Sequence, residues 1–160
     1  MAKVIIYSGI PGSGKSTLIA IRHAADAIPP SIYSTDNYFM KNGHYGYVRE
    51  KQDEAHLWNL RRFLQYITGG SFWGDTTTIV DNVNATTEHI APYAQAARAF
   101  GHEVQIVTML VDPIFAHSRN VHGVSLESVQ RMADQLAHRV LPKTWPEERI
   151  YVPSERINQR

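Results

Sequence analysis

A chain of 160 residues with a formal net charge of +1 is long enough to bury one full hydrophobic core. No stretch approaches the roughly 20 apolar residues of a membrane span, and the absence of cysteine excludes disulfides and thiolate metal sites. The balanced charge argues against a strongly basic nucleic-acid binder, although it does not exclude a local basic groove. We therefore expect a single cytoplasmic domain over residues 1–160, without a signal peptide or a membrane partner.

The first predicted strand leads into a glycine-rich loop of specific spacing. Residues 3–8, KVIIYS, are apolar and β-branched, and the next residues, GIPGSGKS, fit the pattern G-x-x-x-x-G-K followed by Ser or Thr. Residues 16–27 have helical spacing. In this order, backbone N–H groups and a helix N-terminus face a polyphosphate. The sequence predicts an ATP site formed by Gly9, Pro11, Gly12, Ser13, Gly14, Lys15, Ser16 and Thr17.

Two residues of this loop have predicted roles in nucleotide chemistry. The Lys15 ammonium is expected to reach the β- and γ-phosphates, and the Ser16 hydroxyl is expected to ligate Mg²⁺. An ordinary glycine-rich turn is the alternative, and the flanking strand and helix disfavour it.

The later elements alternate as in an α/β fold. We expect strands over residues 31–35, 76–81, 103–111 and 149–152, and helices over residues 50–66, 87–100 and 125–138, with a further helix that begins at residue 113. Gly101 is expected to stop the helix over residues 87–100. Asp112 is expected to cap the helix that begins at residue 113, and Ser125 the last helix. This order predicts a P-loop NTPase three-layer sandwich with a parallel sheet of about four to five strands.

Aromatic residues gather in two segments. In helix 50–66 we expect one apolar side and core positions at Leu57, Leu60, Leu64 and Ile67, with Trp58 and Phe63 also in the core. Residues 38–47 are too irregular for either period and are expected to form a loop. The sequence leaves three alternatives open for its aromatic side chains: stacking on bases, forming a substrate lid, or covering the following helix. These side chains are Tyr38, Phe39, Tyr45 and Tyr47.

Three residues outside the loop predict catalysis. Asp36 follows the second strand, beyond which ligands of parallel sheets bind, and its carboxylate is expected to accept the proton of an attacking hydroxyl. Asp81 ends the third strand, where an acid and Ser16 together hold Mg²⁺. Arg119, beside Gly123, is expected to close over the phosphates. The alternatives are turn residues for the two acids and a solvated side chain for the arginine.

Four segments in order resemble small P-loop kinases similar to phage-type polynucleotide 5′-kinase: GIPGSGKST, STDNYF, IVDNVN, and SRNVHGV followed by SLESVQRM. The likeness runs from about residue 3 to about residue 132. It implies transfer of the ATP γ-phosphoryl group to the 5′-hydroxyl of a nucleic acid or nucleotide. It further implies that Asp36 is the general base, that Lys15 and Ser16 bind phosphate and metal, and that Arg119 is the lid arginine. The small size suits a phage or bacterial source.

The chain departs from this family where the acceptor is held. Asn37 replaces a second acid, and Phe39 replaces an arginine that holds an acceptor phosphate. Lys41 is a candidate for the same anion, but lysine does not reproduce bidentate arginine contacts. Residues 121–123 lack a second lid arginine, and a protonated His122 is a candidate for part of its charge. A nucleoside or small-metabolite kinase, and a nucleotide-dependent binding module without transfer, therefore remain alternatives.

Overall fold

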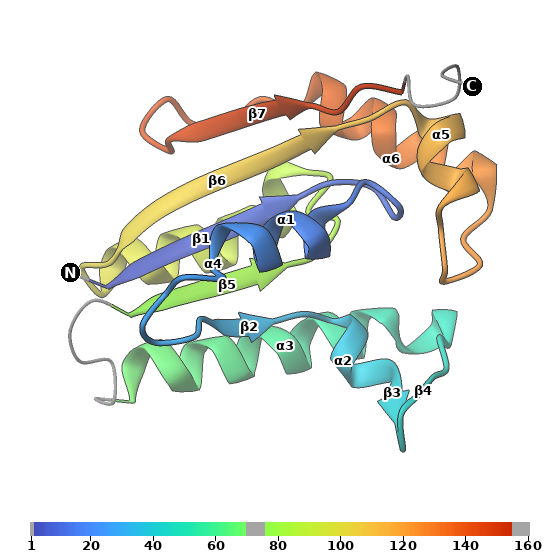
Figure 1. The fold of residues 1–160 in the computed structure, drawn as a ribbon. Helices are drawn as coiled ribbons and strands as arrows, with labels where there is room; N and C mark the ends of the chain where they lie inside the picture. Colours follow the sequence, from blue (N-terminus) through green and yellow to red (C-terminus); the bar gives the residue numbers. More distant parts are fainter. Residues whose placement is uncertain (1, 70–75, 155–160) are drawn as a thin grey trace.

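The computed structural model of the protein describes residues 2–69 and 76–154. Its main sheet has five strands in the order β2-β5-β1-β6-β7, and every neighbouring pair is parallel (Figure 1). The strands span Lys3–Ser8 (β1), Ser31–Tyr33 (β2), Thr77–Asp81 (β5), Glu103–Leu110 (β6) and Glu147–Tyr151 (β7). The predicted α/β class and the parallel sheet are confirmed.

Helices cover both faces of this sheet (Figure 1). They span Lys15–Arg22 (α1), Asp36–Phe39 (α2), Gln52–Thr68 (α3), Thr87–Ala99 (α4), Pro113–Ser118 (α5) and Leu126–His138 (α6), with a 3₁₀ turn, η1, at Arg49–Lys51. Side chains alternate along β1, because Val4 and Ile6 pack under α3 and α4, whereas Ile5 and Tyr7 pack under α1. This alternation produces the predicted three layers.

The helix caps predicted after the fourth strand are confirmed. Asp112 accepts a hydrogen bond from the Phe115 N–H at 2.9 Å, with Pro113 at the first helical position of α5. Ser125 accepts one from the Ser128 N–H at 3.2 Å at the start of α6. These two caps fix where α5 and α6 begin.

The first helix is shorter than predicted, because α1 ends at Arg22 rather than at residue 27. Residues 24–29 are exposed, and Pro29 and Pro30 follow. A segment without a face to bury gains little from continuing a helix, and the residue before a proline disfavours the helical conformation.

Residues 38–47 are not the irregular loop that we expected. Residues 36–39 form α2, and the strands Met40–Lys41 (β3) and His44–Tyr45 (β4) form an antiparallel hairpin. Asn42 and Gly43 join them with φ values of 51° and 78°, which is the geometry of a tight hairpin turn. The Asn-Gly pair was therefore the signal in the sequence that would have found this hairpin.

The face that α3 buries matches the predicted one only in part. Its buried residues are Ala55, Asn59, Phe63 and Ile67, which follow a strict spacing of four, whereas Leu57 is 55% exposed. Trp58 is only half-buried and lies against the ring of Tyr38. The core prediction was thus right for Phe63 and Ile67 and wrong for Leu57, while Leu60 and Leu64 are partly buried and pack against the core.

The last strand, β7, begins two residues earlier than predicted, at Glu147. It pairs with β6, which therefore lies between β1 and β7. None of the helices within residues 2–69 and 76–154 combines the length and the apolar character that crossing a membrane requires.

Candidate active site

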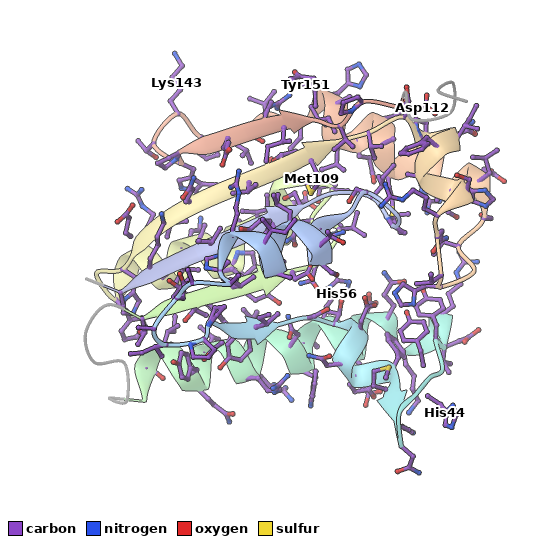
Figure 2. All side chains as sticks on the ribbon, viewed as in Figure 1. His44, His56, Met109, Asp112, Lys143 and Tyr151 are labelled. Atoms are coloured by element: carbon purple, nitrogen blue, oxygen red, sulfur yellow. The ribbon has the colours of Figure 1, made fainter. Side chains whose placement is uncertain are left out.

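The predicted phosphate-binding loop joins β1 to α1 at the carboxyl edge of the sheet. Gly12 and Gly14 have φ values of 82° and 91°, in the left-handed region that suits glycine. Met109 of β6, labelled in Figure 2, holds its Cε 3.8 Å from the position that a Cβ on Gly14 would take. The loop thus follows a tight path directly against the sheet.

Lys15 begins α1 and folds back over the loop. Its Nζ donates a hydrogen bond to the Gly9 carbonyl oxygen at 2.8 Å. Burial lowers the pKa of Lys15, and the nearby carboxylates of Asp81 and Asp36 act in the opposite direction. The buried Ser13 hydroxyl has no hydrogen-bond partner among the described residues. An ammonium and an unpaired hydroxyl in one loop are groups that a bound phosphate would satisfy.

Asp81 ends β5 and pairs in register with Tyr7 of β1, which brings it beside the loop. Burial raises the pKa of Asp81, the Lys15 ammonium opposes this shift, and the Asp36 carboxylate adds to it. Ser16 lies in the first turn of α1. A carboxylate and a hydroxyl are oxygen ligands of the kind that Mg²⁺ takes, so these residues fit the predicted metal role.

Asp36 begins α2 immediately beyond β2, and the neighbouring strand fixes its position. The backbone N–H and the hydroxyl of Thr35 both donate to Asn82 Oδ1, at 2.9 and 2.8 Å. Asn82 follows Asp81, so these bonds hold the two predicted acids on adjacent strand ends. The Asp36 carboxylate is about half-exposed and accepts a hydrogen bond from the Tyr45 hydroxyl at 3.3 Å.

Arg119 caps the C-terminus of α5, as the sequence predicted, and it reaches the loop. Its Nη2 lies 4.0 Å from the position that a Cβ on Gly14 would take. Its guanidinium carbon lies 5.4 Å from the centre of the Phe115 ring. The structure therefore brings Lys15, Asp36, Asp81 and Arg119 to one edge of the sheet.

A family profile described as an AAA domain matches residues 4–141. The chain belongs to this family. Human NEDD4-binding protein 2 is 31% identical over 137 residues, and human YLP motif-containing protein 1 is 28% identical over 153 residues. Each match covers 82% of this chain but 7% of the relative, so the chain spans a small part of either protein. These relatives give no support to the expected phage or bacterial source.

Solved structures share the fold of this AAA domain at low identity. The APS kinase of Mycobacterium tuberculosis superposes with a TM-score of 0.59 and 21% identity, covering 94% of this chain and 88% of that chain. A gluconokinase from Sinorhizobium meliloti superposes with a TM-score of 0.58 and 12% identity, covering 95% of this chain and 85% of that chain. The tunicamycin resistance protein of Deinococcus radiodurans superposes with a TM-score of 0.54 and 15% identity, covering 88% of this chain and 86% of that chain. The AAA domain therefore has a P-loop kinase-like fold.

The sequence offered no sign of Arg139, which lies buried beneath the site of the AAA domain. Its guanidinium donates to the Asn84 carbonyl at 2.6 Å, the Thr108 hydroxyl at 2.6 Å, the Glu147 carboxylate at 2.8 Å and the Ser8 hydroxyl at 3.1 Å. These partners come from four different segments of the chain. Arg139 thus joins β1, β6, β7 and the turn after β5 behind the phosphate-binding loop.

The aromatic residues near Asp36 divide into core and surface. Phe39 is 6% exposed and contacts the rings of Tyr38, Tyr45 and Tyr47, so a base-stacking role for Phe39 is wrong. Lys41 is exposed on β3. Where the resembled kinases carry an acceptor-binding arginine, this AAA domain therefore has a core side chain.

We expect Gly12→Ala to destabilise the AAA domain by about 3 kcal/mol or more. The added Cβ would lie 2.0 Å from the backbone oxygen of Ala116 in α5, and φ is already +82°. Gly43→Ala is the matched control, because its φ is +78° and nothing lies within 4 Å of its Cβ position. The control is expected to lose about 1–2 kcal/mol from backbone strain alone. Urea unfolding measures both, and equal losses would contradict the close approach of α5 to the loop.

We expect Asp81→Asn to raise the melting temperature of the nucleotide-free protein at pH 7, on the order of 2 °C. Because burial raises the pKa of Asp81 in the folded state, its contribution to stability is full below its ordinary value of 3.8 and is lost as pH rises through the raised pKa. Asparagine removes that loss. The gain should thus grow between pH 4 and pH 7 in thermal unfolding. A variant less stable than wild type at pH 7 would show that attraction to Lys15 outweighs burial.

Proposed function

We propose that this AAA domain is an ATP- and Mg²⁺-dependent kinase that transfers the γ-phosphoryl group to a hydroxyl, with the 5′-hydroxyl of a nucleic acid or nucleotide as the leading acceptor. The observation that carries this proposal is that Asp81 and Asp36, at the ends of adjacent strands, lie close enough to Lys15 of α1 for both carboxylates to act on its ammonium. Arg119 faces the same loop from α5.

The nucleotide side of this proposal assigns the loop residues to the phosphates. We assign the backbone N–H groups of Gly12 and Gly14 and the N-terminus of α1 to the polyphosphate, and Lys15 would exchange its bond to Gly9 for one to the β- and γ-phosphates. Ser16 and Asp81 would hold Mg²⁺, which when bound neutralises charge on the phosphates. Arg119 supplies further positive charge where the transferred group becomes negative.

The acceptor side assigns the proton to Asp36. Its carboxylate takes the proton of the acceptor hydroxyl as the hydroxyl oxygen forms a bond to the γ-phosphorus. The bond between that phosphorus and the oxygen bridging to the β-phosphate breaks, and ADP leaves. Because this transition state is loose, positioning and charge neutralisation account for most of the rate gain.

A nucleoside or small-metabolite acceptor is the second candidate, and the burial of Phe39 favours it. A kinase that grips a phosphate next to the reacting hydroxyl needs a cation there, and this side chain is apolar and packed. Proteins that share this fold include a gluconokinase and a sugar kinase. Lys41 is exposed on the hairpin two residues after Phe39, and it is the candidate cation for the phosphate of a polynucleotide end.

The test is transfer of labelled γ-phosphate from ATP with Mg²⁺ to a panel of acceptors. The panel holds 5′-hydroxyl RNA and DNA oligonucleotides, nucleosides, nucleoside monophosphates and gluconate, with Asp36→Asn as the control. Label on oligonucleotides that disappears in the control supports the leading proposal. Label on small acceptors alone supports the second candidate. Bound ATP without any transfer contradicts both and supports a nucleotide-dependent binding module.

A further inference from the structure

We propose that His122 is an acceptor-side positioning residue, and that the segment 119–124 moves it together with Arg119 as one rigid unit. This segment, which we call the lid, follows α5 and precedes α6. The inference rests on the proposed function, because it assigns one end of the lid to the phosphates and the other end to the general base. It adds a mechanical link between the two sides of the site.

His122 and Tyr45 contact Asp36 from two separate parts of the chain. His122 Nε2 lies 3.8 Å from Asp36 Oδ2, and the Tyr45 hydroxyl donates to Asp36 Oδ1 at 3.3 Å. The imidazole and the phenol ring also contact each other, with their centres 4.3 Å apart. Each carboxylate oxygen of Asp36 thus has its own neighbour, and the lid supplies one of them. A carboxylate with two neighbours has fewer orientations than a free one, which favours alignment with an acceptor hydroxyl.

Asn120 gives the lid a fixed shape. Its Oδ1 accepts a hydrogen bond from the His122 backbone N–H at 2.9 Å, and its Nδ2 donates to the Val124 carbonyl at 3.1 Å. Gly123 completes the turn with a φ of +69°. One side chain therefore braces both arms of the turn, and the backbone from Asn120 to Val124, which directly follows Arg119, is held as a unit.

Because the lid is braced, its two functional ends are linked in space. Arg119 Nη2 lies 4.0 Å from the Cβ position of Gly14 in the phosphate-binding loop, while His122 touches the Asp36–Tyr45 pair. An acceptor that reaches Asp36 has to share space with the contact between His122 and Tyr45. Acceptor engagement is then sensed by the same rigid segment that carries the lid arginine.

The first experiment traps this contact and does not depend on transfer. The chain contains no cysteine, so Tyr45→Cys with His122→Cys introduces the only two thiols. A short bis-maleimide should cross-link this pair, and the cross-linked protein should release a fluorescent ATP analogue about tenfold more slowly, because Arg119 is held over the loop. Adding Asn120→Ala should abolish the slower release but not the cross-link.

The matched control pairs Tyr45→Cys with Tyr151→Cys. Tyr151 is 73% exposed, and Figure 2 shows it on β7, at the opposite side of the molecule from His44 of the hairpin. This pair should give no intramolecular cross-link. Absence of a cross-link between positions 45 and 122, or unchanged release of the analogue after cross-linking, would overturn the inference even if the protein proves to be an active kinase.

The second experiment uses steady-state transfer to a 5′-hydroxyl RNA oligonucleotide. His122→Ala should lower kcat/KM for the oligonucleotide by about tenfold or more, while the Kd for ATP changes by less than about twofold. His44→Ala is the control, since His44 is exposed on the same hairpin, next to Tyr45, and should leave both values unchanged. Equal effects of the two variants, or a loss confined to ATP affinity, would overturn the role of His122. No transfer to this oligonucleotide by the wild type would contradict the leading acceptor of the proposed function instead, and the cross-linking result would still decide the lid contact.

Discussion

We expect Arg119→Ala to lower the rate of γ-phosphoryl transfer by about 10³-fold while changing ATP affinity by less than about tenfold. The guanidinium lies over the phosphate-binding loop but does not build it, because the loop is held by its own backbone, by Lys15 and by the sheet. Its charge gains most when the transferred group is most negative, which is in the transition state. Single-turnover transfer and equilibrium ATP binding separate the two effects.

Arg61→Ala is the matched control for this prediction. Arg61 is an exposed residue of α3 and lies outside the candidate site, so its replacement should change neither rate nor affinity. Arg119→Lys keeps the charge without the planar fork and should recover only part of the rate. Wild-type transfer by Arg119→Ala would show that Arg119 is a solvated surface residue.

We expect Asp36→Asn to lower transfer by about 10²–10⁴-fold, which is the range for loss of a general base. Asparagine keeps the size of the side chain and an oxygen that accepts from the Tyr45 hydroxyl, so the local structure should persist. It cannot take the proton of the acceptor. ATP binding should stay within about twofold of wild type, since the phosphate-binding loop is unchanged.

Asp134→Asn on the exposed face of α6 is the control, and it should transfer at the wild-type rate. The same measurements also distinguish the binding-module alternative. A switch protein without transfer would show no difference between the Asp36 and Asp134 variants in any nucleotide-dependent readout. Unchanged turnover in Asp36→Asn, in a protein that does transfer phosphate, would contradict the general-base role.

Local sequence patterns determined the frame of this protein. The glycine spacing predicted the loop, β-branched runs predicted the strands, and capping residues such as Asp112 and Ser125 predicted helix starts, all of which the structure confirms. Asp36 and Asp81 were predicted because the ends of parallel strands meet at one edge of a sheet, and Arg119 was predicted from its place at the end of a short helix and from the family resemblance. These patterns work because they depend on residues that are neighbours along the chain.

Tertiary contacts decided the rest. The Arg139 guanidinium bonds to Ser8 across 131 positions, and no local period in either segment encodes that pairing. The sequence left open whether Phe39 stacks on bases, belongs to a substrate lid or covers the following helix, and the structure buries it against the rings of Tyr45 and Tyr47. His122 and Tyr45 meet on Asp36 only because the lid and the hairpin, which are distant in the sequence, pack together. Burial and side-chain pairing depend on which distant elements pack together. Local sequence patterns predict the helices and strands, but they do not predict which of these elements contact each other.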